Sequence, residues 1–221
     1  LRFFEKGKVF YKRGPGDIRE ETILCFAITG KEKEYFWKER YPDYDYFDMK
    51  GIIEGLIGKL GANCEMSPTG EAFLDPGCSA DVTIDGERIG WIGSIRGDIL
   101  KAYEIEQTIY CAELRFDIIL QKGNLTLQYK PIPRYPQATR DFSFYVDDSV
   151  PIAALVKKIR DISPLIVSVG IFDMFRKELR SVSIRVVFQS YEETLTDERV
   201  NSLQEKIIGE MTNIDGISLR A

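Results

Sequence analysis

A segment with two prolines, a little past the middle of the chain, divides the 221 residues into two parts. Gly123 and Asn124 end an apolar run, and Lys130-Pro131-Ile132-Pro133 follows a few residues later. Each proline fixes its own φ and keeps the preceding residue out of the helical region, so an extended connection is predicted over 123–133. We therefore expect one domain over residues 1–127 and a second over residues 132–221.

The second part shows strand and helix patterns in a definite order. Apolar residues recur at every second position where strands are expected, and at helical spacing after each of two helix-starting residues. The predicted strands cover 141–146, 165–176, 180–190 and 217–220, and the predicted helices begin at Pro151 and Thr196. The order β-α-β-β-α-β predicts a ferredoxin-like domain whose two helices cover one face of the sheet and leave the other open.

The first part is more mixed, and it predicts an antiparallel sheet with flanking helices. The expected elements are strands over 22–29 and 109–119, a helix over 47–60, and a hairpin over 82–95 that turns at Asp85-Gly86. The fold class of the whole chain is therefore α+β. Residues 1–11 alternate like a strand with no Met before them, so we interpret the sequence as a piece cut from a longer protein. The exposed strand edge at 1–11 is expected to pair with other strands.

Histidine is absent from the sequence, which excludes Ser-His-Asp and Cys-His catalysis and histidine-ligated metals. The four cysteines are far apart and none forms a CxxC pair, so reduced thiols and a cytoplasmic location are expected. No apolar run approaches the ~18 residues of a membrane helix, so no membrane partner is expected. The net charge of −5 argues against indiscriminate nucleic-acid binding, and no DNA partner is expected.

The uncovered sheet face of the second part is the first candidate site. Strand alternation predicts that it carries Asp141, Ser143, Tyr145, Ser181, Ser183, Arg185, Ser218 and Arg220. Asp173 and Phe175 join this face if Gly170 hosts a β-bulge. Aromatic rings can stack on unpaired bases, Ser and Asp can read base edges, and Arg can neutralise phosphates. An ordinary solvated face would look similar, so the pattern leaves both interpretations open.

Basic residues near this face could contact an RNA backbone. Arg176, Lys177 and Arg180 gather in the hairpin beside Phe175, and Arg185 lies on the face itself. Arg134 and Arg140 belong to a proline-fixed loop before the first strand, where each could contact a phosphate or pair with a local carboxylate.

Two features of the first part resemble sites, but neither has enough suitable groups to be one. Asp43, Asp45 and Asp48 surround a predicted helix start, where carboxylates suit the helix dipole, and they are too few to define a metal site. Residues 74–80 read as a turn before a strand. Its single Gly77 does not make a phosphate-cradling loop, and no GxxxxGK[ST] or GxGxxG occurs.

The sequence resembles the C-terminal part of bacterial phenylalanine–tRNA synthetase β subunits along nearly its whole length. Each motif alone is weak, but their order and spacing together are specific. In the first part the motifs are Phe4-Glu-Lys-Gly-Lys-Val-Phe10, Phe47-Asp-Met-Lys-Gly51, Leu74-Asp-Pro-Gly77 and Gly90-Trp-Ile-Gly93. In the second part they are Arg134-Tyr-Pro136, Arg140-Asp141, Ile171-Phe-Asp-Met-Phe175, Thr194-Leu-Thr-Asp-Glu198 and Leu219-Arg220.

The resemblance implies an N-terminally truncated, non-catalytic class II synthetase-like module, followed by a ferredoxin-fold anticodon-binding domain. It implies that Asp173, Phe175 and Ser181 contact the anticodon of phenylalanine tRNA. It also implies a partner, the α subunit, which would catalyse the ligase reaction within an α2β2 heterotetramer that this chain helps to assemble. The 221-residue chain itself would need no cofactor, while the full enzyme would use ATP and Mg²⁺. The sequence departs from the family at Leu74-Asp75-Pro76 and Cys78, which weakens any role for that turn.

Two other functions are alternatives for this sequence. The chain could be a regulatory module in which the ferredoxin-like domain binds a small metabolite, which would need a defined pocket. An independent hydrolase or transferase is disfavoured because histidine, a nucleophile motif and a phosphate loop are all lacking.

Overall fold

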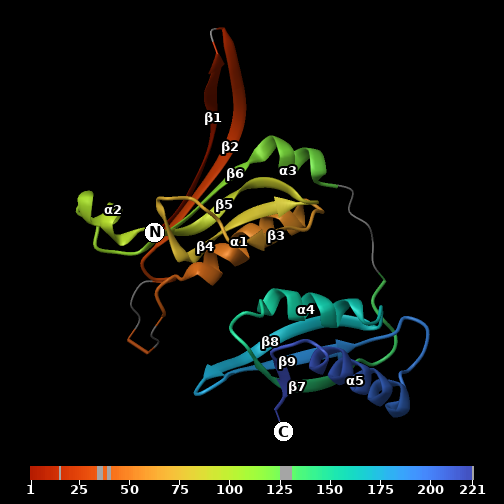
Figure 1. Cartoon of the computed structure of the whole chain (residues 1–221). Coiled ribbons are helices and arrows are strands. Elements are labelled where there is room, and N and C mark those ends of the chain that lie inside the picture. The colour runs from red at the N-terminus through yellow and green to blue at the C-terminus, as the bar shows by residue number, and fades with distance from the viewer. Residues whose placement is uncertain (15, 34–36, 39–40, 125–130, 221) are drawn as a thin grey trace. The chain divides into compact units, whose positions relative to one another are not determined.

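The structure is a computed structural model that describes residues 1–14, 16–33, 37–38, 41–124 and 131–220. The chain divides into two compact units, Leu1–Gln128 (unit 1) and Tyr129–Ala221 (unit 2), as Figure 1 shows. Of the predicted connection over 123–133, residues 125–130 lie outside the described residues. None of the helices in the described ranges is long and apolar enough to cross a membrane.

Unit 1 is built on a six-stranded antiparallel sheet with the spatial order β1-β2-β6-β5-β4-β3. The strands are β1 (Arg2–Gly14), β2 (Asp17–Thr29), β3 (Glu65–Ser67), β4 (Leu74–Ile84), β5 (Glu87–Ile95) and β6 (Ile109–Arg115). The predicted hairpin turn at Asp85-Gly86 is confirmed. Both residues have positive φ, 49° and 77°, which matches the twist of the strands that they join.

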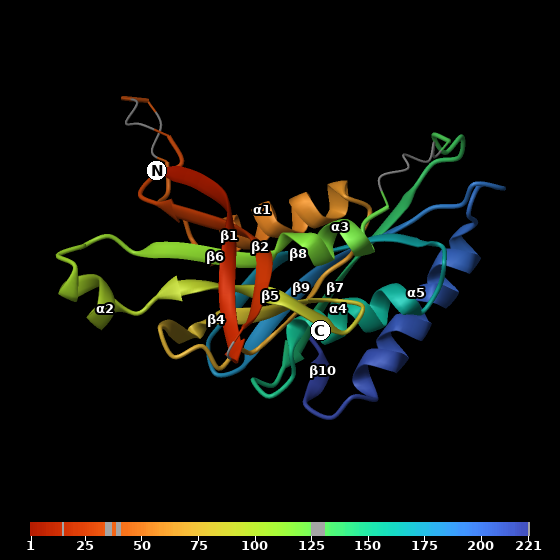
Figure 2. The same cartoon turned by 90° about the horizontal axis from the view of Figure 1, so that it is seen from above.

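Helices cover one face of this sheet. They are α1 (Tyr46–Lys59) and α3 (Phe116–Lys122), while α2 (Gly97–Ala102) lies in the connection between β5 and β6, away from the other two in Figures 1 and 2. Ile53 and Ile57 of α1 and Ile119 of α3 are fully buried against Val82 and Leu114 of the sheet. Among the described residues of unit 1, no helix covers the opposite face of the sheet, which we call its uncovered face.

The expected strand over 109–119 was wrong in its second half. Strand β6 ends at Arg115 and α3 begins at Phe116. A short apolar run such as Ile118-Ile119-Leu120 fits a strand or a buried helix equally well by periodicity. Here the segment forms a helix because the helix places Ile119 in the core beside α1. After the helix, the backbone amide of Asn124 donates to the carbonyl of Leu60 at 2.8 Å.

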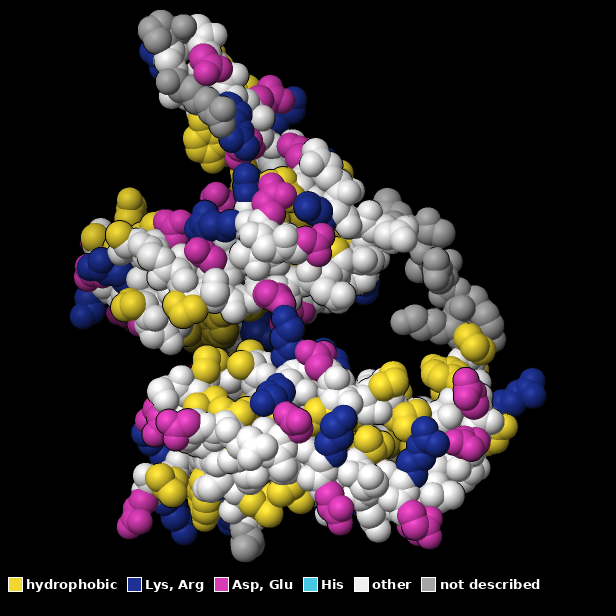
Figure 3. All heavy atoms as spheres, turned by 45° about the vertical axis from the view of Figure 1, so that its right-hand side comes forward, with side chains coloured by type: hydrophobic (Ala, Val, Ile, Leu, Met, Phe, Trp, Pro, Cys, Tyr) yellow, Lys and Arg dark blue, Asp and Glu magenta, His cyan; other side chains and the backbone are white. Residues whose placement is uncertain are grey.

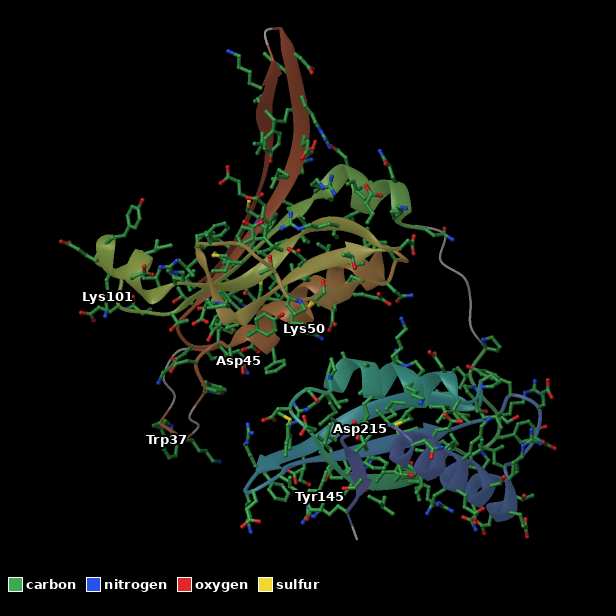
Figure 4. The ribbon with its side chains drawn as sticks, in the orientation of Figure 1. Trp37, Asp45, Lys50, Lys101, Tyr145 and Asp215 are labelled. Atoms are coloured by element: carbon green, nitrogen blue, oxygen red, sulfur yellow. The ribbon has the colours of Figure 1, made fainter. Side chains whose placement is uncertain are left out.

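The carboxylates at the start of α1 cap that helix. Asp45, which Figure 4 shows at this position, accepts hydrogen bonds from the backbone amides of Phe47 and Asp48 at 2.7 and 3.1 Å. Asp48 accepts in return from the amide of Asp45 at 2.8 Å. This reciprocal capping box satisfies amides that the helix itself leaves unpaired. It gives these two aspartates a structural role.

Residues 74–80 form a bulged start of β4, whereas the sequence predicted a turn before a strand. The register with β5 shifts between Leu74 and Ser79. Within the bulge, Asp75 accepts from the amide of Gly77 at 2.8 Å and the Ser79 hydroxyl donates to the Asp75 carbonyl at 2.7 Å.

Strands β1 and β2 continue well beyond the rest of the sheet as a two-stranded hairpin (Figure 1). Strand β1 is the edge strand, and both of its faces are exposed along most of its length. Phe3, Phe4 and Phe10 are each more than half exposed. The outer part of this hairpin is therefore held mainly by its own ladder of hydrogen bonds.

Unit 2 has the predicted β-α-β-β-α-β order. Its elements are β7 (Ala138–Val146), α4 (Ile152–Asp161), β8 (Ile166–Arg176), β9 (Arg180–Phe188), α5 (Asp197–Thr212) and β10 (Ile217–Leu219). All pairings are antiparallel in the spatial order β10-β7-β9-β8, the arrangement of a ferredoxin-like fold. Both helices pack on the same face, where Phe144, Ile159, Val186 and Ile207 form a fully buried core. Over residues 131–220, no helix lies on the second face.

Candidate nucleic-acid interface

The uncovered face of unit 2 is set by strand alternation and register. Phe142 and Phe144 of β7 and Val182 and Ile184 of β9 point into the core, so their neighbours point the other way. Cross-strand pairing then places Asp141 beside Arg185, Ser143 beside Ser183, and Tyr145 (labelled in Figure 4) beside Ser181. These residues occupy the face that the sequence predicted for them.

Strand β8 brings Asp173 and Phe175 to the same face by means of a bulge. The register with β9 shifts at two places, between Ile166 and Ser168 and between Ile171 and Asp173, and Phe172 is the extra residue of the second bulge. Asp173 then pairs with Ser183, and Phe175 pairs with Ser181. The sequence had placed the bulge at Gly170, and that position was wrong, because Gly170 pairs regularly with Arg185. The expected face of Asp173 and Phe175 is nevertheless the one observed.

Phe175, Arg220 and Ser181 form one cluster at this face. The Arg220 guanidinium lies over the Phe175 ring, 4.7 Å from its centroid, and donates to the Ser181 hydroxyl at 3.1 Å. The backbone amide of Arg220 is fixed by the Ser143 carbonyl at 2.8 Å. Ser181 is fully buried beneath this arrangement. Its hydroxyl can therefore reach a ligand only after Arg220 moves.

A second aromatic residue on this face, Phe172, also carries an arginine. The Arg185 guanidinium lies 5.0 Å from the Phe172 centroid and makes a two-point hydrogen bond to the Asp141 carboxylate at 2.8 and 2.7 Å. These hydrogen bonds hold the pKa of Asp141 below its usual value. A guanidinium stacked on a ring can in turn stack a base or bind a phosphate.

Asp173 and the serines supply hydrogen-bonding groups between the two aromatic clusters. Asp173 is exposed and makes no salt bridge with any residue that the structure describes. Ser143 and Ser183 share a hydrogen bond at 3.0 Å. An acceptor flanked by stacking surfaces is the combination that single-stranded RNA recognition uses.

Two of the three residues in the predicted basic cluster of the β8–β9 hairpin form contacts within the protein. Arg180 is half-buried and donates to the carbonyls of Asp147 and Val150 at 2.6 and 2.7 Å. Arg176 pairs with Asp148. Both therefore hold the loop between β7 and α4. Lys177 is exposed at the hairpin tip.

The arginines before and within β7 differ from each other. Arg140 points to the helix-covered side, where it donates to Gln204 and Asn201 of α5, both at 3.2 Å. It therefore ties β7 to α5. Arg134 is exposed. Over the face in view in Figure 3, basic and acidic side chains are interspersed and form no single large basic patch.

Two residues of the face were not predicted as site residues, namely Phe172 and Arg220. Alternation assigned Arg220 to this face, but its contact with Phe175 had no sequence signal, because β10 and β8 lie at opposite edges of the sheet and only the long Arg220 side chain spans the strands between them. Phe172 had no such signal, because only the bulge turns its ring toward Arg185.

Comparison with known proteins assigns both units. The family described as phenylalanyl tRNA synthetase beta chain CLM domain matches residues 1–116, more than half of the chain. This chain belongs to the phenylalanyl-tRNA synthetase beta chain family. A second family model, described as ferredoxin-fold anticodon binding domain, matches residues 133–220, a range that contains every described strand and helix of unit 2.

Relatives in the beta chain family align over nearly the whole sequence. The chain is 30% identical to the phenylalanine–tRNA ligase beta subunit of Clostridium acetobutylicum, over 99% of this chain and 27% of that protein. It is 29% identical to the corresponding subunit of Geobacillus kaustophilus, over 100% of this chain and 28% of that protein. The chain thus spans little more than a quarter of the length of these curated relatives.

One solved structure shows a weaker likeness. Pyrrolysyl-tRNA synthetase from Desulfitobacterium hafniense aligns with a TM-score of 0.40 and 14% identity, over 55% of this chain and 40% of that chain.

Proposed function

We propose that this chain is the part of a phenylalanine–tRNA ligase beta subunit that binds the anticodon region of phenylalanine tRNA. The observation that carries the proposal is the match of residues 133–220 to an anticodon-binding domain, together with Asp173 and Phe175 on its uncovered face. Phe175 would stack on a base and Asp173 would accept from a base edge. Ser181 would contribute only after Arg220 has been displaced.

The ligase reaction would take place elsewhere in the assembly. Unit 1 would support assembly with an α subunit, in an α2β2 heterotetramer, and the α subunit would use ATP and Mg²⁺. This chain's own residues would bind no cofactor. We place the assembly in the cytoplasm, where tRNA is charged.

Backbone contacts would come from the exposed cations. Lys177 and Arg134 are free to meet phosphates, and Arg185 could do so from its position over Phe172. Arg140, Arg176 and Arg180 would act indirectly, by holding the elements that present the face. With a net charge of −5, the chain alone would bind tRNA weakly, and the rest of the ligase would have to hold the tRNA in place.

The test is tRNA affinity of the whole ligase assembled with variants of this chain. We expect Phe175→Ala or Asp173→Ala to weaken binding of phenylalanine tRNA by about 1–3 kcal/mol, the scale of one stacked base. Phe47→Ala, which removes an exposed ring from α1, is the matched control and should leave affinity unchanged. Equal affinities for all three variants, with unit 2 still folded, would contradict the proposal.

Salt dependence separates the two kinds of contact. Lys177→Gln should weaken binding for any RNA sequence and lower the slope of log affinity against log salt by about 1. Phe175→Ala should leave that slope unchanged.

A further inference from the structure

The uncovered face of unit 1 contains a hollow of about 490 Å³, a volume typical of small-molecule sites. Its lining combines aromatic rings (Tyr11, Phe73 and Trp91) with charged side chains that include Glu113 and Arg115. Phe73 and Trp91 meet edge to face, with centroids 5.0 Å apart and planes at 77°, and so form an aromatic corner.

Strand register places Glu113 and Trp91 side by side in this hollow. Glu113 lies on β6, paired with Trp91 of β5 on one side and with Cys25 of β2 on the other. Arg115 follows two residues later on the same strand, so its side chain leaves the same face about 7 Å further along. The carboxylate and the guanidinium are therefore held on one surface beside the aromatic corner.

The other charges that line the hollow are already paired. Arg88 is bound by Glu71 at 2.7 Å and by Asp81 at 2.8 Å. Glu21 pairs with Arg19. Across the described part of the chain, neither Glu113 nor Arg115 takes part in a salt bridge, although both are half-buried. The polar contact of the Glu113 carboxylate is the Cys25 thiol at 4.0 Å, a weak donor.

Partly desolvated charges without partners are costly, and the cost falls when a ligand supplies the opposite charges. Burial, and then the charge of Glu71, raises the pKa of Glu113, which agrees with a carboxylate that lacks a counter-ion. The two unpaired groups have opposite signs and a net charge of zero. A ligand that satisfies both must carry an ammonium and a carboxylate on a short frame.

We propose that this hollow binds a small zwitterion, namely a free α-amino acid with an apolar or aromatic side chain. The ligand ammonium pairs with Glu113 next to Trp91, whose ring face also attracts a cation. The ligand carboxylate is held by the guanidinium of Arg115. Its side chain packs into the corner of Phe73 and Trp91. This site is separate from the anticodon-binding face, and the proposal does not depend on RNA binding.

The experiment titrates the 221-residue chain with L-leucine and L-phenylalanine by ligand-observed NMR and calorimetry. Each amino acid is compared with its amide, which lacks the carboxylate, and with its N-acetyl derivative, which lacks the ammonium. We expect the zwitterions to bind with a dissociation constant below about 10 mM and both derivatives to bind at least about tenfold more weakly.

Variants assign each charge to its partner. Glu113→Gln should weaken zwitterion binding about tenfold and leave binding of the N-acetyl derivative unchanged, because that derivative has no ammonium to lose. Arg115→Gln should show the same pattern for the amide. Glu87→Gln, at the hairpin tip outside the hollow, and Arg199→Gln, on α5 of unit 2, are the matched controls.

Circular dichroism spectra would establish that each variant folds. Absence of zwitterion binding up to about 10 mM would overturn the proposal. So would equal affinity for the zwitterion and both derivatives, or unchanged affinity in Glu113→Gln and Arg115→Gln with the fold intact.

Discussion

In the described parts of both units, helices cover one face of the sheet only. The two uncovered faces differ in whether their charged side chains are paired. In unit 2, Arg185 is satisfied by Asp141 and lies over Phe172, and Arg220 is satisfied by Ser181 and lies over Phe175. In unit 1, Arg88 forms salt bridges with Glu71 and Asp81. Glu113 and Arg115, however, line the hollow and form no salt bridge with any described residue. A face with internally paired charges suits a broad ligand that adds stacking. A hollow with unpaired charges suits a small ligand that brings its own counter-charges.

The largest expected effect concerns how closely the strands approach beneath the hollow. A Cβ on Gly90 would lie 1.9 Å from the Glu113 carbonyl oxygen, so Gly90→Ala should force β5 and β6 apart. We expect unit 1 to lose about 3 kcal/mol or more in denaturant unfolding. Gly170→Ala in unit 2 is the control, because a Cβ there meets no atom within 4 Å. Similar losses for both variants would show that the two sheets do not differ in this respect.

A smaller effect should separate the paired arginine from the unpaired one. Arg220→Ala removes a hydrogen bond and a ring contact, so unit 2 should lose about 1–2 kcal/mol. Arg115→Ala removes no salt bridge among the described residues, and unit 1 should change by less than about 0.5 kcal/mol. Thermal and chemical unfolding of the two variants measures both values. The contrast fails if Arg115→Ala costs as much as Arg220→Ala.

A raised carboxyl pKa predicts a gain in stability on neutralisation. Folding raises the pKa of Glu113, so the folded state holds its proton more tightly, and stability declines as pH rises from the unfolded to the folded pKa. Glu113→Gln should therefore stabilise unit 1 at pH 7, by less than about 1 kcal/mol because water still screens a half-buried group. The gain should vanish in acid, below the unfolded pKa. A loss of stability at pH 7 would mean that Glu113 has a partner in solution.

For Asp141 of unit 2, we expect the opposite pH dependence of stability, and the effect should be smaller than in the three preceding predictions. Folding lowers the pKa of Asp141 through its hydrogen bonds from Arg185, so its contribution is present above the unfolded pKa and is lost as pH falls through the folded one. Asp141→Asn should lower the thermal midpoint at neutral pH, and the difference should close in acid. Added salt should shrink it at neutral pH, since the pair is exposed. A midpoint unchanged at every pH would remove this contrast with Glu113.

Sequence patterns supplied the element order of unit 2 and the residues of its uncovered face, because alternation and helix-start residues are local signals. They did not supply the position of the bulge in β8, which depends on pairing with β9. Nor could they show that Arg176 and Arg180 turn to the loop at 147–150, since a long side chain takes its partner from whatever the fold brings near. The hollow of unit 1 joins Tyr11, Phe73, Trp91 and Glu113 from four separate segments, and no spacing in the sequence links them. The anticodon-contact roles of Asp173, Phe175 and Ser181 stay predictions.

The bulge at Phe172 in β8 has a consequence for how the gene can change. Above the bulge Ile171 pairs with Ile184, and below it Asp173 pairs with Ser183, so deletion of the Phe172 codon would join two stretches that are already in phase. A one-codon insertion or deletion in the hairpin at 177–179 would instead shift the whole ladder and exchange the two faces of the strand. Among relatives, we therefore expect insertions or deletions of one residue at Phe172 and of two residues in the hairpin. An alignment that distributes its gaps otherwise would compare Asp173 and Phe175 with residues of the core.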